Sequence, residues 1–241
     1  MVMEFELQSL NLTSLKEPSI HTISQIQPHG VLLVLEEPEL NILQVSSNTY
    51  DVFGITPENM LQKKLEDLLD PFQMEKIKAG LLQESLDMIN PTKIWARVKG
   101  DEYIVFDGIF HRNADGFLIL ELELAFSQEN IPFLSFYHLA RASINKLEET
   151  GNLHDFCQIL VQEVRKVTGF DRVMLYKFDD DGHGSVIAEE KLATMESYLG
   201  LHYPESDIPR PARKLFASNW IRIIPDTQAE PVEIFPAINP L

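Results

Sequence analysis

The sequence predicts an α+β protein of two domains, and three features of its 241 residues lead to this expectation. The stretch Phe117–Phe126 alternates leucine with polar residues, which indicates a half-buried antiparallel strand. Phe133–Glu149 and Leu153–Val167 instead repeat apolar residues at helical spacing, which indicates two amphipathic helices. A polar linker, Ser127–Pro132, separates the strand from the helices and divides the chain into two domains.

The first domain is expected over Ile20–Phe126, after an arm of residues 1–19 that lacks sustained periodicity. Its short apolar runs are separated by turn residues, as in an antiparallel sheet with short helices. Asp70 caps one predicted helix, and Pro71 occupies the first position of that helix. The predicted strands are Val31–Leu35, Asn41–Val45, Lys93–Lys99, Tyr103–Phe110 and Phe117–Phe126, and the predicted helices are Thr49–Phe53, Leu65–Leu69 and Phe72–Leu82.

The second domain is expected over residues 133–241. Its predicted strands are too few to form a sheet that covers the apolar faces of its helices. A sheet this small leaves unpaired edges and too little apolar cover, so the domain is expected to be incomplete. The aspartate-rich turn at residues 179–184 lacks the alternating ligands of a calcium loop and is interpreted as a hairpin turn. After the two helices come predicted strands Arg172–Phe178 and Ser185–Glu189, helix Pro209–Phe216, strand Trp220–Ile224 and an acidic tail, Glu230–Leu241.

The net charge of −17 argues against nucleic acid and anionic membrane surfaces as partners. No apolar run is long enough to span a membrane, and Met1–Leu10 lacks the basic start of a signal peptide. Cys157 has no partner for an internal disulfide, so a cytoplasmic location is expected. We predict that Cys157 is a small buried residue and not a reactive thiol.

No motif for catalysis or metal binding occurs in the chain. The seven histidines are scattered, and no paired Cys-x-x-Cys, His-Glu-x-x-His, nucleophile elbow or glycine-rich phosphate loop is present. The sequence therefore predicts no catalytic residue and no metal site.

Tyr203–Arg213 contains three prolines and is predicted to form a stiff turn. Ser206 and Asp207 lie inside this turn, and Pro209 is placed to begin a helix. An acidic residue held at a helix start can meet a polar ligand. The alternative is an ordinary surface turn capped by Asp207.

Three further residues have two interpretations each. Arg222 lies in an apolar run. If its side chain points inward, it needs an anionic partner, because an unpaired buried cation is too costly. Alternatively, side chains alternate along the strand and Arg222 faces water. Tyr176 ends a predicted strand and Tyr203 opens the proline-rich turn. Each is either a core residue or presents its hydroxyl to a pocket.

Several segments resemble the phytochrome family in the order in which that family has them. Asp207-Ile208-Pro209 with Ala212-Arg213 resembles the chromophore-cradling signature of phytochrome GAF domains. Residues 20–30, ending in Ile-Gln-Pro-His-Gly, resemble the start of the phytochrome PAS domain. Phe170–Phe178 resembles the first GAF strand, and residues 222–226 and 231–234 continue the match over nearly the whole chain.

The resemblance implies a PAS domain followed by an incomplete GAF domain, with a possible N-terminal knot formed around Ile26. It also implies that the GAF pocket holds a bilin, either phycocyanobilin or biliverdin. In the family, the carbonyl at Asp207 accepts hydrogen bonds from pyrrole N–H groups, and its carboxylate takes part in photoconversion. Ile208 and Pro209 pack on the rings, and Arg222 pairs with a propionate.

The remaining residues implied by the resemblance are Tyr176 and Tyr203, beside the ring that rotates, together with Met174 and Ser206. Covalent attachment is not implied for this chain. The position of the biliverdin-binding cysteine of bacteriophytochromes is Ser14 here, and the GAF cysteine of other members would lie beyond Leu241. Cys157 matches neither position.

Phe216 stands where many relatives have a tyrosine that touches a propionate. The expected function is that of a light sensor that signals by photoisomerisation to downstream domains, commonly a histidine kinase. A homodimer is the expected assembly. The alternative is a PAS/GAF interaction or dimerisation module without pigment.

Overall fold

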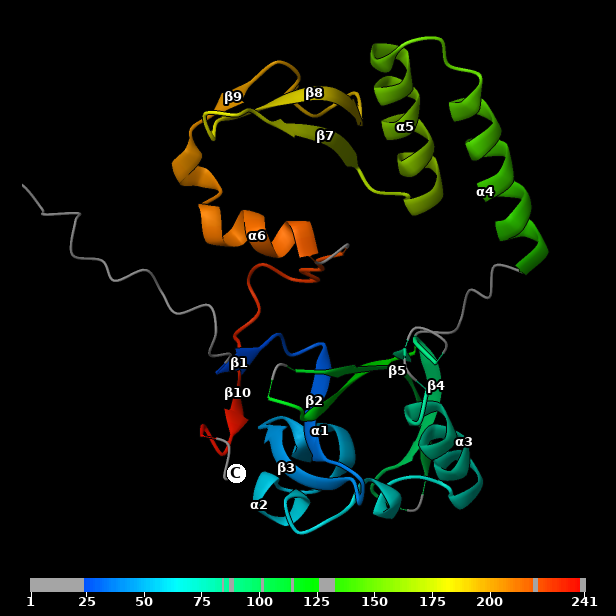
Figure 1. The fold of residues 1–241 in the computed structure, drawn as a ribbon, viewed down its shortest axis with the longest axis vertical. Coiled ribbons are helices and arrows are strands. Elements are labelled where there is room, and N and C mark those ends of the chain that lie inside the picture. The colour runs from blue at the N-terminus through cyan, green and yellow to red at the C-terminus, as the bar shows by residue number, and fades with distance from the viewer. Residues whose placement is uncertain are drawn as a thin grey trace, which may run out of the picture. The chain divides into compact units, whose positions relative to one another are not determined.

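The computed structural model describes residues 24–238 except 84, 87, 88, 101, 114, 126–132, 219 and 220. The arm at residues 1–19 and the linker at residues 127–132 therefore lie outside the described residues. The chain divides into two compact units (Figure 1). The first unit is formed by described residues of Met1–Ala125 and Ile224–Leu241, and the second by those of Phe126–Ile223. The sequence-based boundaries put residues 224–241 in the second domain, whereas the contacts of the described residues 224–238 assign these to the first unit.

The first unit contains an antiparallel sheet with short helices on one face (Figure 1). Its strand order is β1-β10-β3-β2-β6-β5-β4. The strands are β1 Gln25–Ile26, β2 Gly30–Glu36, β3 Asn41–Ser46, β4 Thr92–Arg97, β5 Tyr103–Arg112, β6 Leu118–Leu124 and β10 Val232–Phe235. The helices are α1 Thr49–Phe53, α2 Pro57–Met60, the 3-10 helix η2 Leu65–Asp67 and α3 Pro71–Leu81.

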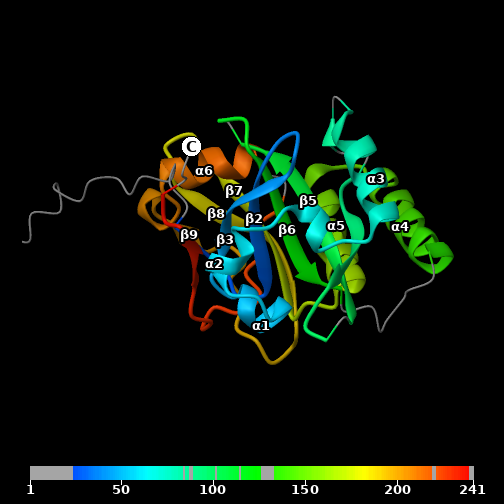
Figure 2. The same cartoon turned by 90° about the horizontal axis from the view of Figure 1, so that it is seen from below.

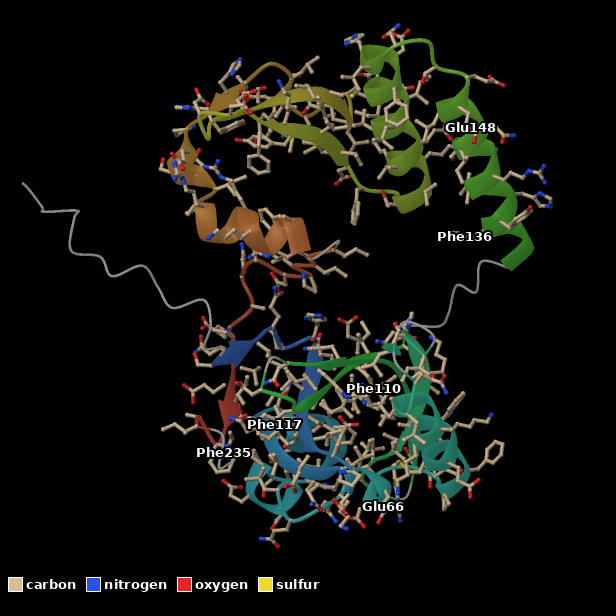
Figure 3. All side chains as sticks on the ribbon, in the orientation of Figure 1. Glu66, Phe110, Phe117, Phe136, Glu148 and Phe235 are labelled. Atoms are coloured by element: carbon tan, nitrogen blue, oxygen red, sulfur yellow. The ribbon has the colours of Figure 1, made fainter. Side chains whose placement is uncertain are left out.

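The strand predicted from leucine alternation forms as β6, slightly shorter at both ends. Leu118, Leu120 and Leu122 are buried in the main core, whereas Leu124 at the end of the strand is 38% exposed. Phe110 on the neighbouring strand is fully buried in the same core (Figure 3). The expectation of a half-buried strand is confirmed over residues 118–122.

The predicted cap of α3 is confirmed. The Oδ1 atom of Asp70 accepts hydrogen bonds from the backbone N–H of Phe72 at 2.9 Å and of Gln73 at 3.3 Å. Pro71 takes the first position of the helix, where no N–H is needed. By contrast, the predicted helix Leu65–Leu69 is only the short 3-10 helix η2, and α2 was not predicted at all.

The predicted tail, Glu230–Leu241, contains the strand β10, so the expectation of a tail was wrong for this stretch. β10 pairs with β3 on one side and with β1 on the other, where Ile26 lies opposite Val232. Ile234 is buried against Leu32 and Val34 on the face of the sheet away from the helices. Segments near the two ends of the described chain thus lie side by side (Figure 1).

The second unit contains a three-stranded antiparallel sheet and a helical hairpin. The strand order of this sheet is β7-β8-β9. Helices α4 and α5 run side by side, as Figure 1 and Figure 2 show. The elements are α4 Phe133–Glu148, α5 Leu153–Thr168, β7 Arg172–Phe178, β8 Gly184–Lys191, β9 His202–Tyr203, the 3-10 helix η4 Glu205–Asp207 and α6 Arg210–Ser218. Within the described chain, no helix has the length and apolar character needed to cross a membrane.

Helix α5 packs on the sheet through a face that lies one position away from the predicted apolar stripe. Cys157 and Val161 are buried against Ala188 of β8, which confirms the expectation that Cys157 is a buried residue. The stripe predicted for this helix was Phe156, Leu160, Val164 and Val167; Leu160 is half-buried, and the other three remain 36%, 37% and 37% exposed. Cys157 and Val161 each follow a stripe residue by one position, so the face that packs on the sheet is rotated from the predicted one.

The predicted strand Trp220–Ile224 does not form where the structure describes it. Trp220 lies outside the described residues, and residues 221–224 have no regular secondary structure. Ile221 and Ile223 are 78% and 60% exposed. A strand needs a neighbour for its backbone hydrogen bonds, and the described sheet of the second unit consists of β7, β8 and β9.

Candidate functional site

Strand β7 presents apolar side chains on both faces. Val173 and Leu175 pack towards α5. Because side chains alternate along a strand, Met174, Tyr176 and Phe178 point to the opposite face. Met174 and Phe178 are 42% and 41% exposed, so this second face has an incomplete apolar cover.

Tyr176 and Tyr203, which the sequence predicted as site residues, lie together on this uncovered face. Their ring centroids are 5.9 Å apart, and the ring of Tyr176 meets that of Phe178 edge-on at 5.1 Å. Gly184 of β8 permits this cluster, since a Cβ atom there would lie 2.3–2.4 Å from atoms of the Tyr176 ring. The phenol of Tyr176 thus covers the backbone of Gly184 directly.

The proline-rich turn leads from β9 through η4 into α6. Asp207 N–H donates to the carbonyl oxygen of Pro204 at 3.2 Å, and the Ser206 hydroxyl lies 3.4 Å from Oδ1 of Asp207. Ser206, Asp207 and Pro209 are exposed, whereas Ile208 is half-buried. The helix begins at Arg210, one residue after the predicted start at Pro209.

Charged side chains surround this turn. The Nε atom of Arg210 donates to the Glu205 carboxylate at 2.6 Å, and Nη2 of Arg213 lies 3.6 Å from the same oxygen. The hydrogen bond from Arg210, together with the charges of Arg210, Arg213 and His183, lowers the pKa of Glu205 below its ordinary value. Arg213 also donates to backbone carbonyls of the turn. The sequence indicated Arg213 only as part of a motif, although opposite charges flanking a braced turn were a signal for this contact.

Arg222 is exposed in the structure. Its guanidinium carbon lies 6.0 Å from the ring centroid of Phe216, which is itself 39% exposed. The described geometry therefore agrees with the interpretation in which Arg222 faces water. Arg222 and the tyrosine pair lie in the same unit, and its role towards an anion stays a prediction.

A cavity of about 850 Å³ lies in the first unit, and its described lining contains none of the predicted site residues. Helix α3 and strands β4 and β5 form it, and Phe72, Trp95 and Tyr103 are among its lining residues.

In the described part of the chain, no group of three or more histidine, cysteine, aspartate and glutamate side chains could hold a metal.

Comparison with known proteins agrees with the division into two units. Residues 15–125 match the PAS fold and residues 152–237 match the GAF domain, so the class of protein is a PAS–GAF pair. The GAF match runs to residue 237 and thus includes β10, which joins the sheet of the first unit.

The relatives and solved structures described next are named as phytochromes or phytochrome-like proteins. The chain is 70% identical over 241 residues to cyanobacterial phytochrome A of Nostoc sp., covering 100% of this chain and 32% of that protein. It is 51% identical over 235 residues to the phytochrome-like protein Cph1 of Synechocystis sp., covering 98% and 31%. The chain therefore spans about a third of the length of these curated relatives.

Among solved structures, the chromophore-binding domain of a wild-type Stigmatella aurantiaca phytochrome matches at 45% identity and a TM-score of 0.83. That match covers 89% of this chain and 70% of the solved one. The chromophore-binding domain of a bacteriophytochrome from R. palustris matches at 35% identity and a TM-score of 0.85, covering 93% and 71%. The chain belongs to the phytochrome family, which confirms the resemblance stated from its motifs.

Proposed function

We propose that this chain is the PAS–GAF portion of a light sensor that binds a bilin on its GAF unit and signals by photoisomerisation to downstream domains. The observation that carries the proposal is the similarity, at 45% identity over 89% of this chain, to a solved phytochrome domain named for chromophore binding. The downstream output, a histidine kinase in the expected case, belongs to the same proposal. So does a cytoplasmic location, which the single cysteine favours.

The exposed residues of the GAF unit fit the chemistry of a bilin. A bilin is a conjugated and largely apolar molecule with pyrrole N–H donors and two propionate groups, and it supplies absorption of light and isomerisation of a double bond. Met174 and the Tyr176–Tyr203 pair offer an incompletely covered apolar surface for its rings. The exposed turn at Asp207 offers acceptors for the N–H groups.

The other predicted residues have complementary roles in this proposal. Ile208 and Pro209 pack on the rings, and Ser206 lies beside Asp207 at the rim of the site. Arg222 is exposed, and in this proposal its guanidinium forms a charge-assisted pair with a propionate.

Cys157 is not the attachment point in this proposal. The residue is 5% exposed and lies in the core between α5 and the sheet, on the face of β7 opposite Met174 and Tyr176. The described residues therefore hold phycocyanobilin or biliverdin through non-covalent contacts.

The test is co-expression with the genes for phycocyanobilin or for biliverdin, using both this chain and a version extended through a complete GAF domain. The expected result is a red absorbance band and a red-light difference spectrum in the extended form. Asp207→Ala should weaken photoconversion more than pigment binding, whereas Asp180→Ala, an exposed aspartate on the β7–β8 turn, should change neither. The absence of a red band and of a difference spectrum in both forms contradicts the proposal and favours the pigment-free module.

The assembly in this proposal is a homodimer formed through α4 and α5. Tyr137 and Ile144 on α4 are 43% and 54% exposed, as are parts of the stripe on α5 at Phe156 and Val164. Phe136, which lies on the same helix α4 and is labelled in Figure 3, is 49% exposed. Large apolar side chains in rows on two packed helices are typical of an interaction surface.

Light scattering after size exclusion tests the dimer. Ile144→Glu is expected to shift the protein to the monomer, because a charge would be buried in an apolar contact. Asn145→Glu introduces the same charge at the next, exposed position and should leave the dimer intact. A monomer in the wild type, or a dimer that tolerates Ile144→Glu, contradicts this part of the proposal.

A further inference from the structure

Arg213 lies in the first turn of α6, and its side chain reaches back to the turn that precedes the helix. Its Nε donates to the carbonyl oxygen of Ile208 at 2.7 Å, and its Nη2 donates to the carbonyl oxygen of Glu205 at 3.2 Å. These two carbonyls lie on either side of Ser206 and Asp207 in the chain. One planar guanidinium therefore holds a peptide group before Ser206 and another after Ile208, and Asp207 lies between them.

The guanidinium is itself held by its surroundings. The Glu205 carboxylate lies 3.6 Å from Nη2, and the side chain of Arg213 is only 18% exposed. The ring centroid of Phe178, at the end of β7, lies 5.4 Å from the guanidinium carbon. Because a guanidinium has donors in a fixed fork, these contacts also fix the direction of its hydrogen bonds.

The turn between β7 and β8 packs against the same group. Gly182 has a φ of +90°, and a Cβ atom there would lie 2.8 Å from the carboxyl carbon of Glu205 and 3.1 Å from Nη1 of Arg213. Glycine adopts this backbone conformation without strain, and any other residue would displace the Glu205 and Arg213 side chains. The contact joins the β7–β8 turn to the turn that contains Asp207.

We propose that Arg213 and Glu205 form a clamp that positions the Asp207-Ile208-Pro209 turn for its ligand. The Arg213 clamp consists of the guanidinium of Arg213, the carboxylate of Glu205 and the carbonyls of Glu205 and Ile208. It engages the carbonyls of Glu205 and Ile208, on either side of the Ser206-Asp207 pair. The carbonyl of Asp207 stays outside the clamp, where a ligand N–H group can reach it. Arg213 acts through the turn and is a positioning residue, and its role towards pigment rests on the bilin-binding function proposed above.

Hydrogen exchange of this chain without pigment tests the clamp alone. Arg213→Lys keeps the charge but replaces the planar fork with a single ammonium, which cannot span both carbonyls. Amide exchange in the peptide over residues 204–213 should rise by about tenfold or more, as expected when a charge-assisted hydrogen bond is lost. Peptides from α5 and β8 should keep their protection, which shows that the unit is folded.

Arg210→Lys is the matched control. Arg210 lies in the same helix and contacts the same carboxylate, but its side chain is 79% exposed and donates to no turn carbonyl in the described structure. In Arg210→Lys, amide exchange in the peptide over residues 204–213 should change by less than about threefold, in keeping with the small effect of an exposed ion pair. Glu205→Gln provides a second variant of the clamp and should raise exchange in the same peptide. Unchanged exchange in both Arg213→Lys and Glu205→Gln overturns the clamp.

The role towards pigment is tested on the form extended through a complete GAF domain and loaded with phycocyanobilin. Arg213→Lys should broaden or shift the red band and lower the photoconversion yield, whereas Arg210→Lys should leave both unchanged. A raised exchange rate with an unchanged spectrum and yield overturns the positioning role. A wild-type protein that binds no pigment contradicts the proposed function, while the exchange result still decides whether the clamp exists.

Discussion

The carboxylate of Glu189 lies 3.3 Å from the Nε of Arg172 inside the second unit, with only 3% of the Glu189 side chain exposed. Donors from the loop after β8 complete its surroundings. The Ser197 hydroxyl donates to it at 2.6 Å, and the backbone N–H of Tyr198 donates at 3.0 Å. The guanidinium of Arg172 also stacks 3.7 Å from the ring centroid of Tyr198. One buried carboxylate thus ties β7, β8 and the loop towards β9 together.

Glu189→Gln should destabilise the second unit by about 3 kcal/mol, because it leaves Arg172, whose side chain is only 12% exposed, without its counter-charge. The effect is measured by urea unfolding, with hydrogen exchange of β8 peptides to assign it to the second unit. Glu190→Gln is the control, since Glu190 lies 3.9 Å from Arg165 and its side chain is 32% exposed. That change should cost less than about 1 kcal/mol. Equal losses for the two variants would contradict the role given to Glu189.

The second unit should lose stability in acid. Burial raises the pKa of Glu189, but the hydrogen bonds from Ser197 and from loop N–H groups, with the charge of Arg172, outweigh it and lower the pKa. The hydrogen bonds from Lys146 and Ser143 lower the pKa of Glu163, which joins α4 to α5. A carboxylate with a lowered folded-state pKa stabilises the fold above its ordinary pKa, and this contribution is lost as pH falls through the folded-state value.

The loss should therefore begin below the ordinary glutamate value of 4.5 and continue as pH falls. This loss of stability is measured as a fall in the urea unfolding midpoint from neutral pH to about pH 3. The double variant Glu163→Gln with Glu189→Gln should show a flatter acid limb than the wild type. An acid limb of unchanged slope would mean that other carboxylates are responsible.

Local signals in the sequence predicted most elements, because their causes lie within a few residues. Asp70 and Pro71 mark the start of α3, and leucine alternation marks β6. β10 was missed because the residues that make it a strand are distant in the chain. Val232 and Phe235 find their partners at Ile26 and Val45, and nothing near β10 in sequence indicates this pairing.

The site was predicted less completely, for a similar reason. The motif around Asp207 is contiguous, so the sequence could indicate it directly. The approach of the Tyr176 ring to Gly184 depends on strand register, which a single sequence does not show. The contacts of Arg213 depend on the exact path of the turn, and the expected strand around Arg222 failed for lack of a neighbouring strand.

Loss of the cap at α3 should weaken the first unit. Asp70→Ala removes the acceptor for the N–H groups of Phe72 and Gln73 and should cost about 1 kcal/mol in thermal or urea unfolding. Asp70→Asn is the matched control, because asparagine is an equally good N-cap, and its cost should be smaller. If the two substitutions cost the same, the charge of Asp70 matters more than its hydrogen bonds.

The packing of Tyr176 over Gly184 gives a test by double-mutant cycle. Gly184→Ala places a methyl group 2.3–2.4 Å from atoms of the Tyr176 ring, so the ring or the strand must shift. The cost should be about 2 kcal/mol, within the usual range for overpacking. Tyr176→Ala removes the three atoms nearest to the added methyl group, and Gly184→Ala should then cost at least about 1 kcal/mol less.

Gly151→Ala serves as the control for this cycle, because no atom lies within 4 Å of the added Cβ at Gly151. Its effect should be small and independent of Tyr176, since it acts mainly by restricting the unfolded chain. The stability of each variant is followed by urea unfolding and by exchange of β8 peptides. If Gly184→Ala costs the same with and without the tyrosine ring, Tyr176 does not lie over Gly184. The aromatic cluster with Tyr203 then needs another arrangement, and the proposed pigment surface changes with it.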